Sequence, residues 1–202
     1  MKDSSFFMLF QKLFSFIFIL ILFISVFFIP LFSSDYNSVT NHLYTNNISN
    51  YNQEYIWPLR QHFTITSSYG KRISPTAGAS SFHKGIDISA PESTELLAVA
   101  DGTITFTNFL GGGGYTITLS ISDSTKVSYC HVSPNYIVHN GDFIKQGSVI
   151  GHVGPKNVYG VLGNKYKDAN GRPTNGATTG PHLHIGFRIN GNYENPLNYI
   201  KK

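Results

Sequence analysis

Cysteine is almost absent from this sequence, and charged residues are scarce. Among 202 residues there is one cysteine, Cys130, and 13% are Asp, Glu, Lys or Arg. A disulfide framework within the chain is therefore excluded. Cys130 lies in the strand-like stretch Val-Ser-Tyr-Cys-His, where a small buried core residue is a better interpretation than a nucleophile.

Basic residues do not gather into a patch. The formal net charge is +4, and Lys71-Arg72 and Lys201-Lys202 are the only adjacent basic pairs. Nucleic-acid binding requires a basic stripe or patch, so we expect no nucleic-acid partner.

The sequence after about position 53 shows no helix of amphipathic period and no internal repeat. Short β-type runs alternate there with Gly- and Asn-containing turns, because turns need Gly and Asn while strands favour aromatic and β-branched residues. This rhythm predicts an all-β, largely antiparallel fold. The expected strands are 63–66, 85–88, 95–99, 103–109, 115–121, 126–131, 149–153 and 184–189.

One N-terminal segment has a different character. Residues 13–32 are twenty uncharged residues rich in Phe, Ile and Leu, and a helix of that length spans about 30 Å, the thickness of a hydrocarbon core. The alternative of a core helix in a soluble domain fits less well, because a soluble helix would show a polar face, which this segment lacks. A cleaved signal peptide is the stronger alternative, but its apolar region is usually about 7–15 residues and ends at small residues. This run is longer and ends at Leu31-Phe32, so we expect one uncleaved transmembrane helix.

The flanking segments complete the expected organisation. Lys2 and Lys12 precede the apolar run, which favours a cytoplasmic N-terminus, and the stretch after it is rich in Asn, Ser, Thr and Tyr, as in a flexible tether. The expected parts are a cytoplasmic N-terminus (1–12), a transmembrane anchor (13–32), a tether (33–52) and a folded domain (53–202). The protein would be a single-pass cell-membrane protein with its domain outside the cytoplasm.

Two segments pair residues that suit a metal. In His83-Lys-Gly-Ile-Asp87, side chains at i and i+4 of an extended chain point to the same face, so an imidazole and a carboxylate, both good zinc donors, can converge. In His182-Leu-His184, the two histidines share one face of a strand, and we expect Leu183 to turn to the opposite, buried side.

A third histidine, His131, follows Tyr129 and Cys130 at the end of an expected strand. The three segments together offer two histidines and one carboxylate as ligands, with two histidines left over. A closed structural zinc site needs four protein ligands, whereas a catalytic site takes three and keeps an open position. The remaining imidazoles can transfer protons or stabilise an oxyanion. His42, His62, His139 and His152 have no motif partner and are expected outside the site.

These motifs, HKGID, YCH and GPHLH in this order, resemble the signature of the lysostaphin-type zinc endopeptidases, which cut peptide stems or cross-bridges of peptidoglycan. The similarity covers about residues 57–199 and includes Trp57-Pro58 and the stretches 65–72, 98–102 and 147–151. Three separated motifs within matching framework stretches are far more specific than any single motif.

The resemblance implies a role for each motif residue. His83, Asp87 and His184 would be the zinc ligands, while His131 and His182 would assist the attacking water and the tetrahedral intermediate. The expected function is therefore a membrane-anchored zinc metalloendopeptidase whose partner is the peptidoglycan peptide.

Two features around the motifs bear on specificity. Gly186 stands where the family often has an acidic residue, which affects the surroundings of the ligands rather than the ligands themselves. The four glycines 111–114 and the Gly- and Pro-rich loop 155–180 are expected to line the substrate cleft, because a loop that long in a compact domain is usually functional or disordered.

An alternative function is a non-catalytic peptidoglycan-binding or scaffold module on the same fold, for example in a cell-envelope or sporulation complex. Non-catalytic members of the family typically lose a zinc ligand, whereas this sequence keeps all three. A secreted bacteriocin-like lytic enzyme fits less well with a membrane anchor.

Overall fold

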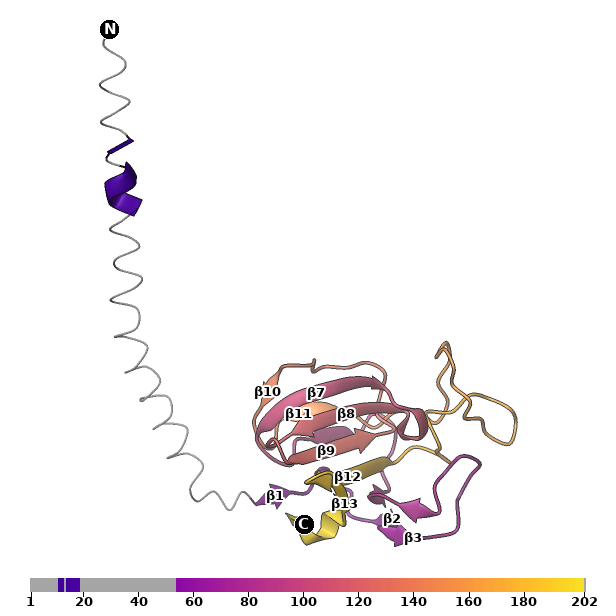
Figure 1. The fold of residues 1–202 in the computed structure, drawn as a ribbon. Helices are drawn as coiled ribbons and strands as arrows, with labels where there is room; N and C mark the ends of the chain where they lie inside the picture. Colours follow the sequence, from indigo (N-terminus) through magenta and orange to yellow (C-terminus); the bar gives the residue numbers. More distant parts are fainter. Residues whose placement is uncertain (1–10, 13, 19–53, 202) are drawn as a thin grey trace. The chain divides into compact units, whose positions relative to one another are not determined.

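The computed structural model describes residues 11–12, 14–18 and 54–201 (Figure 1). The chain divides into two units, Met1–Asn52 and Gln53–Lys202. In the first unit the described residues are helical. Across the described parts of the chain, no helix is both long enough and apolar enough to cross a membrane. The expected anchor, apart from residues 14–18, and the expected tether lie outside the described residues.

The second unit is built from β-strands, as the sequence predicts, with two short 3-10 turns at Gly111–Gly113 and Pro196–Asn198. Its strands, in chain order, are β1 (Tyr55–Ile56), β2 (Ile65–Ser67), β3 (Gly70–Lys71), β4 (Phe82–His83), β5 (Ile86–Ile88), β6 (Glu95–Leu97), β7 (Gly102–Phe109), β8 (Tyr115–Ser120), β9 (Thr125–Cys130), β10 (Phe143–Ile144), β11 (Val149–His152), β12 (Leu183–Ile189), β13 (Asn192–Glu194) and β14 (Ile200–Lys201).

One antiparallel sheet forms the centre of this unit (Figure 1). Its strand order is β10-β7-β8-β9-β12-β5-β2, with β13 also paired to β12. The pairs β6–β11 and β3–β4 are antiparallel as well, and β1–β14 is parallel. The mostly β, antiparallel architecture expected from the sequence is confirmed.

All eight expected strands are present, with ends shifted by up to two residues. The sequence did not predict β1, β3, β4, β10, β13 and β14, which have only two or three residues each. A run that short has no period of its own, so its strand conformation comes from the neighbour with which it pairs.

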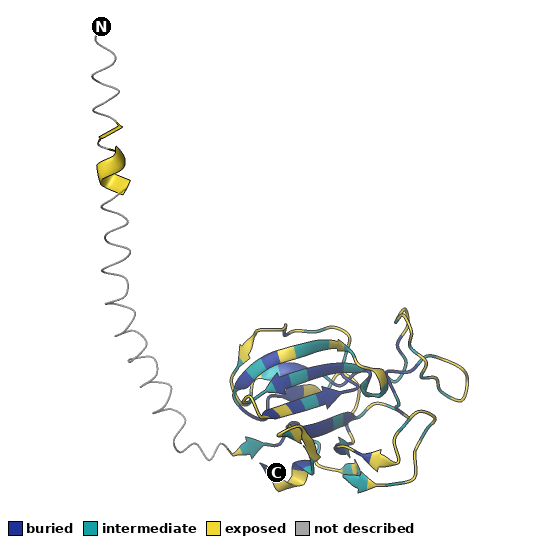
Figure 2. Ribbon diagram, viewed as in Figure 1, coloured by how far each residue is buried: buried dark blue, intermediate teal, exposed yellow. Residues whose placement is uncertain are grey.

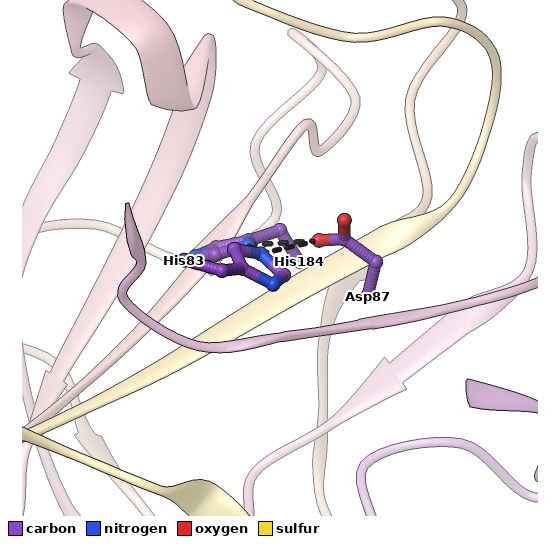
Figure 3. A group of neighbouring side chains, drawn as sticks. All are labelled: His83, Asp87 and His184. Carbon is purple, nitrogen blue, oxygen red and sulfur yellow. Dashed lines mark hydrogen bonds and ion pairs between the residues drawn. The ribbon is translucent and has the colours of Figure 1, made fainter. Parts of the chain in front are cut away.

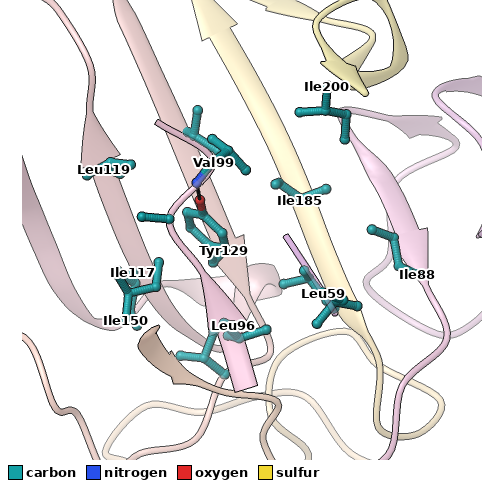
Figure 4. Close-up of a cluster of buried hydrophobic side chains, with 14 of the residues drawn as sticks. Leu59, Ile88, Leu96, Val99, Ile117, Leu119, Tyr129, Ile150, Ile185 and Ile200 are labelled. Carbon is teal, nitrogen blue, oxygen red and sulfur yellow. Dashed lines mark hydrogen bonds between the residues drawn. The ribbon is translucent and has the colours of Figure 1, made fainter. Parts of the chain in front are cut away.

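Buried aliphatic side chains from the central strands form the core, and Tyr129 lies among them (Figures 2 and 4). The ring of Tyr129 is fully buried, and its hydroxyl accepts a hydrogen bond of 2.9 Å from the backbone N–H of Val99. Full burial of an Ile or Leu side chain such as Ile117 or Ile185 contributes about 1.5–3 kcal/mol. Tyr129 is therefore a core residue, as expected, and the core fixes β9 and β12 beside each other.

Candidate metal centre

Strand register brings the separated motifs together. His184 on β12 lies directly opposite Asp87 on β5 and, on its other side, opposite Cys130 on β9. Residues opposite each other on neighbouring strands have Cβ atoms about 4.5–5.5 Å apart and share a face. Since His131 is the next residue after Cys130, all three histidine-containing segments meet at one end of β12.

His83 and Asp87 converge as expected, but residues 83–87 do not form the continuous extended chain from which that convergence was predicted. His83 ends β4, Asp87 is the middle residue of β5, and the chain changes direction between them at Lys84-Gly85. The turn still brings His83 Nε2 to 3.1 Å from Asp87 Oδ1 (Figure 3). The bend at residues 84–85, rather than the pleat of a single strand, makes the two side chains converge.

The three donor atoms lie close enough to hold one cation (Figure 3). His83 Nε2 and His184 Nδ1 are 2.8 Å apart, and His184 Nδ1 is 2.9 Å from Asp87 Oδ1. Tetrahedral zinc with bonds of about 2.0–2.1 Å separates its ligand atoms by about 3.3 Å. A small outward adjustment therefore accommodates zinc, so the residues fit this metal.

The hydrogen bonds of His83 leave the correct nitrogen for a metal. Its Nδ1 lies 2.9 Å from the carbonyl oxygen of Ser68. A carbonyl can only accept, so Nδ1 carries the hydrogen and donates it. The lone pair then resides on Nε2, the atom that faces Asp87 and His184, and the Ser68 carbonyl fixes the ring orientation.

The carboxylate of Asp87 is held in its charged form. Burial alone would raise the pKa of Asp87, but hydrogen bonds with His182, His184 and His83 outweigh it and lower the pKa well below its usual range. Its other oxygen, Oδ2, lies 3.2 Å from Arg72 Nη1. Asp87 therefore presents a negative oxygen to the histidines at any pH near neutrality.

His131 and His182 stand beside this cluster with their ring centroids 4.8 Å apart. Nδ1 of His131 donates to the carbonyl of Asn175 at 2.7 Å, and Nδ1 of His182 donates to the carbonyl of Gly180 at 2.9 Å. Both rings thus keep Nε2 as the nitrogen that can accept a proton. His182 Nε2 lies 3.5 Å from Asp87 Oδ1.

Burial keeps two of these imidazoles neutral. It lowers the pKa of His131 to about 3, with nearby His182 and His184 adding to the effect. Burial also lowers the pKa of His184, against the opposing influence of Asp87. Neutral imidazoles suit a metal site, because neither a ligand nor its neighbour then adds positive charge.

A cleft of about 840 Å³ contains the five residues. The glycine-rich turn contributes Gly112 and Gly113, and the long loop contributes Ala177, Thr179 and Gly180. Part of each stretch therefore lines the cleft, whereas most of the loop 155–180 does not. Cys130 borders it but is buried, and burial raises the pKa of its thiol to about 11. Cys130 is therefore a packed thiol and not a thiolate nucleophile, in line with the sequence-based interpretation.

Three residues around the site were not expected from the sequence. Arg72 and Ser67 contact the ligand side chains, and Asn175 holds His131. Arg72 and Ser67 belong to the matching stretch 65–72, which was a possible signal, while Asn175 lies in a loop without periodicity.

The histidines without a motif partner stay apart from the site where they are described. His62, His139 and His152 are not among the residues that line the cleft, and His42 lies outside the described residues.

Comparison with known proteins gives one family. The sequence profile of Peptidase family M23 matches residues 81–196, more than half of the chain. DD-carboxypeptidase/endopeptidase Mpg of Neisseria meningitidis is 34% identical over 133 residues, which cover 66% of this chain and 26% of that protein. Peptidoglycan DD-endopeptidase ShyC of Vibrio cholerae is 28% identical over 133 residues, covering 65% of this chain and 26% of the relative. The chain thus spans about a quarter of the length of these relatives.

A solved structure agrees with the sequence matches. The catalytic domain of the antimicrobial peptidase lysostaphin from Staphylococcus simulans superposes with a TM-score of 0.53 at 26% identity. The superposition covers 68% of this chain and 91% of that domain. The residues matched by the family profile, 81–196, include the whole histidine cluster.

Proposed function

Because this chain belongs to Peptidase family M23, we propose that it is a zinc metalloendopeptidase that hydrolyses peptide bonds in peptidoglycan stems or cross-bridges. One observation carries the proposal. Donor atoms of His83, Asp87 and His184 lie 2.8–3.1 Å apart, with His131 and His182 beside them, in an open cleft.

The donor set suits zinc better than a hard cation. Two imidazole nitrogens and one carboxylate oxygen are ligands that zinc accepts readily, whereas calcium and magnesium prefer sites made of oxygen atoms. We assign His83 Nε2, Asp87 Oδ1 and His184 Nδ1 as the three ligands. Three protein ligands leave one position open for water or substrate.

When bound at such a site, zinc lowers the pKa of a water ligand and polarises the scissile carbonyl. Side chains of the protein itself would carry out the proton transfers. We assign Nε2 of His182 as acceptor of the proton that water releases during attack. His131, whose pKa is about 3, stays neutral until a proton reaches it, and its protonated form is acidic enough to give that proton to the leaving amine.

Peptidoglycan is proposed as substrate from the family and from one relative, which is a peptidoglycan DD-endopeptidase. The size of the cleft, about 840 Å³, is compatible with a peptide of a few residues. Its lining combines apolar side chains such as Ile73 and Leu110 with polar backbone at Gly112 and Gly113.

We further propose that residues 13–32 anchor the protein in the cell membrane and that the peptidase unit lies outside the cytoplasm. The proposal rests on the length and apolarity of the segment. In its described part, residues 14–18, the large apolar side chains of Phe14, Phe16 and Phe18 are exposed by 62–67%. Apolar side chains around a helix favour a lipid environment over water.

The test combines metal content with peptidoglycan digestion. Residues 53–202 would be purified as parent, His184→Ala and His182→Ala, and assayed for bound zinc and for new amino termini released from peptidoglycan. We expect about one zinc in the parent, loss of zinc in His184→Ala, and retained zinc with a fall in kcat/KM of about 10²–10⁴-fold in His182→Ala.

Two other outcomes would change the conclusion. A parent that binds zinc but releases no amino termini from any peptidoglycan preparation would favour the binding or scaffold alternative. A parent that digests peptidoglycan with no metal bound would contradict the zinc mechanism. His152→Ala is the control, because His152 does not line the cleft.

A further inference from the structure

Arg72 reaches from the loop after β3 to the metal cluster. Its Nη1 lies 3.2 Å from Asp87 Oδ2, the carboxylate oxygen that does not face the histidines. Oδ1 of the same carboxylate lies 2.9 Å from His184 and 3.1 Å from His83. The two oxygens of Asp87 thus face different partners: Oδ2 faces the guanidinium of Arg72, and Oδ1 faces the histidine nitrogens.

The same guanidinium is linked to a second ligand. Arg72 Nη1 donates to Ser67 Oγ at 2.6 Å, and Ser67 Oγ lies 3.2 Å from His83 Nδ1. Ser67 on β2 is also the register partner of Asp87 on β5. One arginine nitrogen therefore contacts Asp87 directly and His83 through one hydroxyl.

Arg72 itself is held in place. Its backbone N–H donates to the carbonyl of Ser81 at 2.8 Å, and its Nε donates to the carbonyl of Ser80 at 3.4 Å. The side chain is 20% exposed and that of Asp87 13%, so water competes for these contacts less than at an open surface. The guanidinium is consequently positioned before any metal binds.

We propose that Arg72, with Ser67, is a positioning residue that presents Asp87 to zinc through Oδ1 alone and fixes the His83 ring. This inference rests on the proposed function, because it assumes that the cluster binds zinc. Occupying Oδ2 with a hydrogen bond disfavours a bidentate carboxylate and leaves a coordination position for water or substrate. Partners behind the ligands commonly change metal affinity or activity by about 10–100-fold when they are removed.

A lysine cannot replace this geometry. Arginine offers several N–H donors in a rigid plane, whereas an ammonium is a single point on a flexible stem. Arg72→Lys keeps the positive charge near Asp87 but has no second nitrogen to bond the Ser80 carbonyl, the contact that orients the guanidinium whose Nη1 serves both Asp87 Oδ2 and Ser67 Oγ. The Arg72→Lys variant therefore tests the geometry of the guanidinium separately from its positive charge.

The experiment measures metal binding on the full chain after chelation. Zinc Kd is determined by competition with a chromophoric chelator for the parent, Arg72→Met, Arg72→Lys, Ser67→Ala and the control Lys71→Met, the neighbouring exposed cation. We expect Kd to rise about 10–100-fold in Arg72→Met, less in Arg72→Lys and Ser67→Ala, and less than twofold in Lys71→Met. Cobalt substituted for zinc should show weaker visible absorption in Arg72→Met, as expected for a higher coordination number.

Each result decides one question. If Arg72→Met binds zinc within twofold of the parent with an unchanged cobalt spectrum, the positioning role is wrong, whatever its thermal stability. If Arg72→Met does not fold, Arg72→Lys and Ser67→Ala carry the test, and parental Kd values in both would overturn the inference. If the parent itself binds no zinc, the proposed function fails, and the inference fails with it.

Discussion

The imidazole of His131 donates from Nδ1 to the backbone carbonyl of Asn175, at 2.7 Å and across 44 positions of the sequence. Asn175 is fully buried and uses its own side chain for two more hydrogen bonds. Its Nδ2 donates to the carbonyl of Val132 at 2.9 Å, and its Oδ1 accepts from the N–H of Tyr115 at 2.7 Å. The long loop is thereby attached to the sheet at the place where His131 needs an acceptor.

Replacing Asn175 should weaken both the fold and the site. Asn175→Ala leaves the carbonyl of Val132 and the N–H of Tyr115 without partners, and a buried unsatisfied group costs about 1–3 kcal/mol. We expect the free energy of unfolding in urea to fall by about 2–5 kcal/mol, together with a lower kcat. The exposed Asn192→Ala is the control and should change it by less than about 0.5 kcal/mol. Equal effects of the two substitutions would contradict this role.

The stability of the metal-free protein should fall with acidity because of His131. Its pKa is about 3 in the folded chain and about 6.5 when unfolded. Below pH 6.5 the imidazole of His131 therefore binds a proton in the unfolded chain but not in the folded chain. The free energy of unfolding consequently decreases as pH falls toward 3. For one group the slope is up to about 1.4 kcal/mol per pH unit.

Comparison with His131→Asn isolates this contribution, because asparagine can still donate to the Asn175 carbonyl but does not titrate. Urea unfolding with a chelator present, at pH 7, 6, 5 and 4, should give a shallower pH dependence in the variant. Parallel curves for parent and variant would show that His131 is not the group responsible.

Gly85 should be required for the geometry of His184. A Cβ at this position would collide with the backbone carbonyl of Ile185 and lie 2.8 Å from His184 Nε2. Gly85→Ala is expected to cost about 1–3 kcal/mol of stability through overpacking and to weaken zinc binding at least about tenfold. Gly180→Ala is a matched control from the same cleft, since a Cβ there meets no atom within 4 Å. Parental zinc affinity in Gly85→Ala would refute the prediction.

Zinc should stabilise the folded chain through the three ligands. After chelation, zinc added at about 100 times its Kd should raise the free energy of unfolding by about 2.7 kcal/mol, because the metal binds the folded state preferentially. Asp87→Ala should remove this increase, whereas His152→Ala should retain it. Thermal unfolding with and without zinc measures the effect, and an increase that survives in Asp87→Ala would place the metal elsewhere.

Local sequence patterns predicted the main strands because each of these runs is long enough for a strand pattern to be recognised. The runs around Ile117, Tyr129 and Phe187 have the apolar content and turn boundaries of sheet strands, and these became β8, β9 and β12. The two-residue strand β4 has no such pattern, so the pairing of His83 with Gly70 could not be predicted. For the same reason the turn at Lys84-Gly85 was not expected.

The sequence by itself determined the kind of chemistry, because residue type decides which atoms can bind a metal. The sequence alone reveals four histidines and one aspartate in three motifs of a β-type chain. Only the tertiary structure decided which nitrogen of each ring is free and which residues stand behind the ligands. The positions of Arg72 and Asn175 depend on contacts between segments 15 and 44 residues apart, and such contacts arise from packing and strand register, which no local pattern contains.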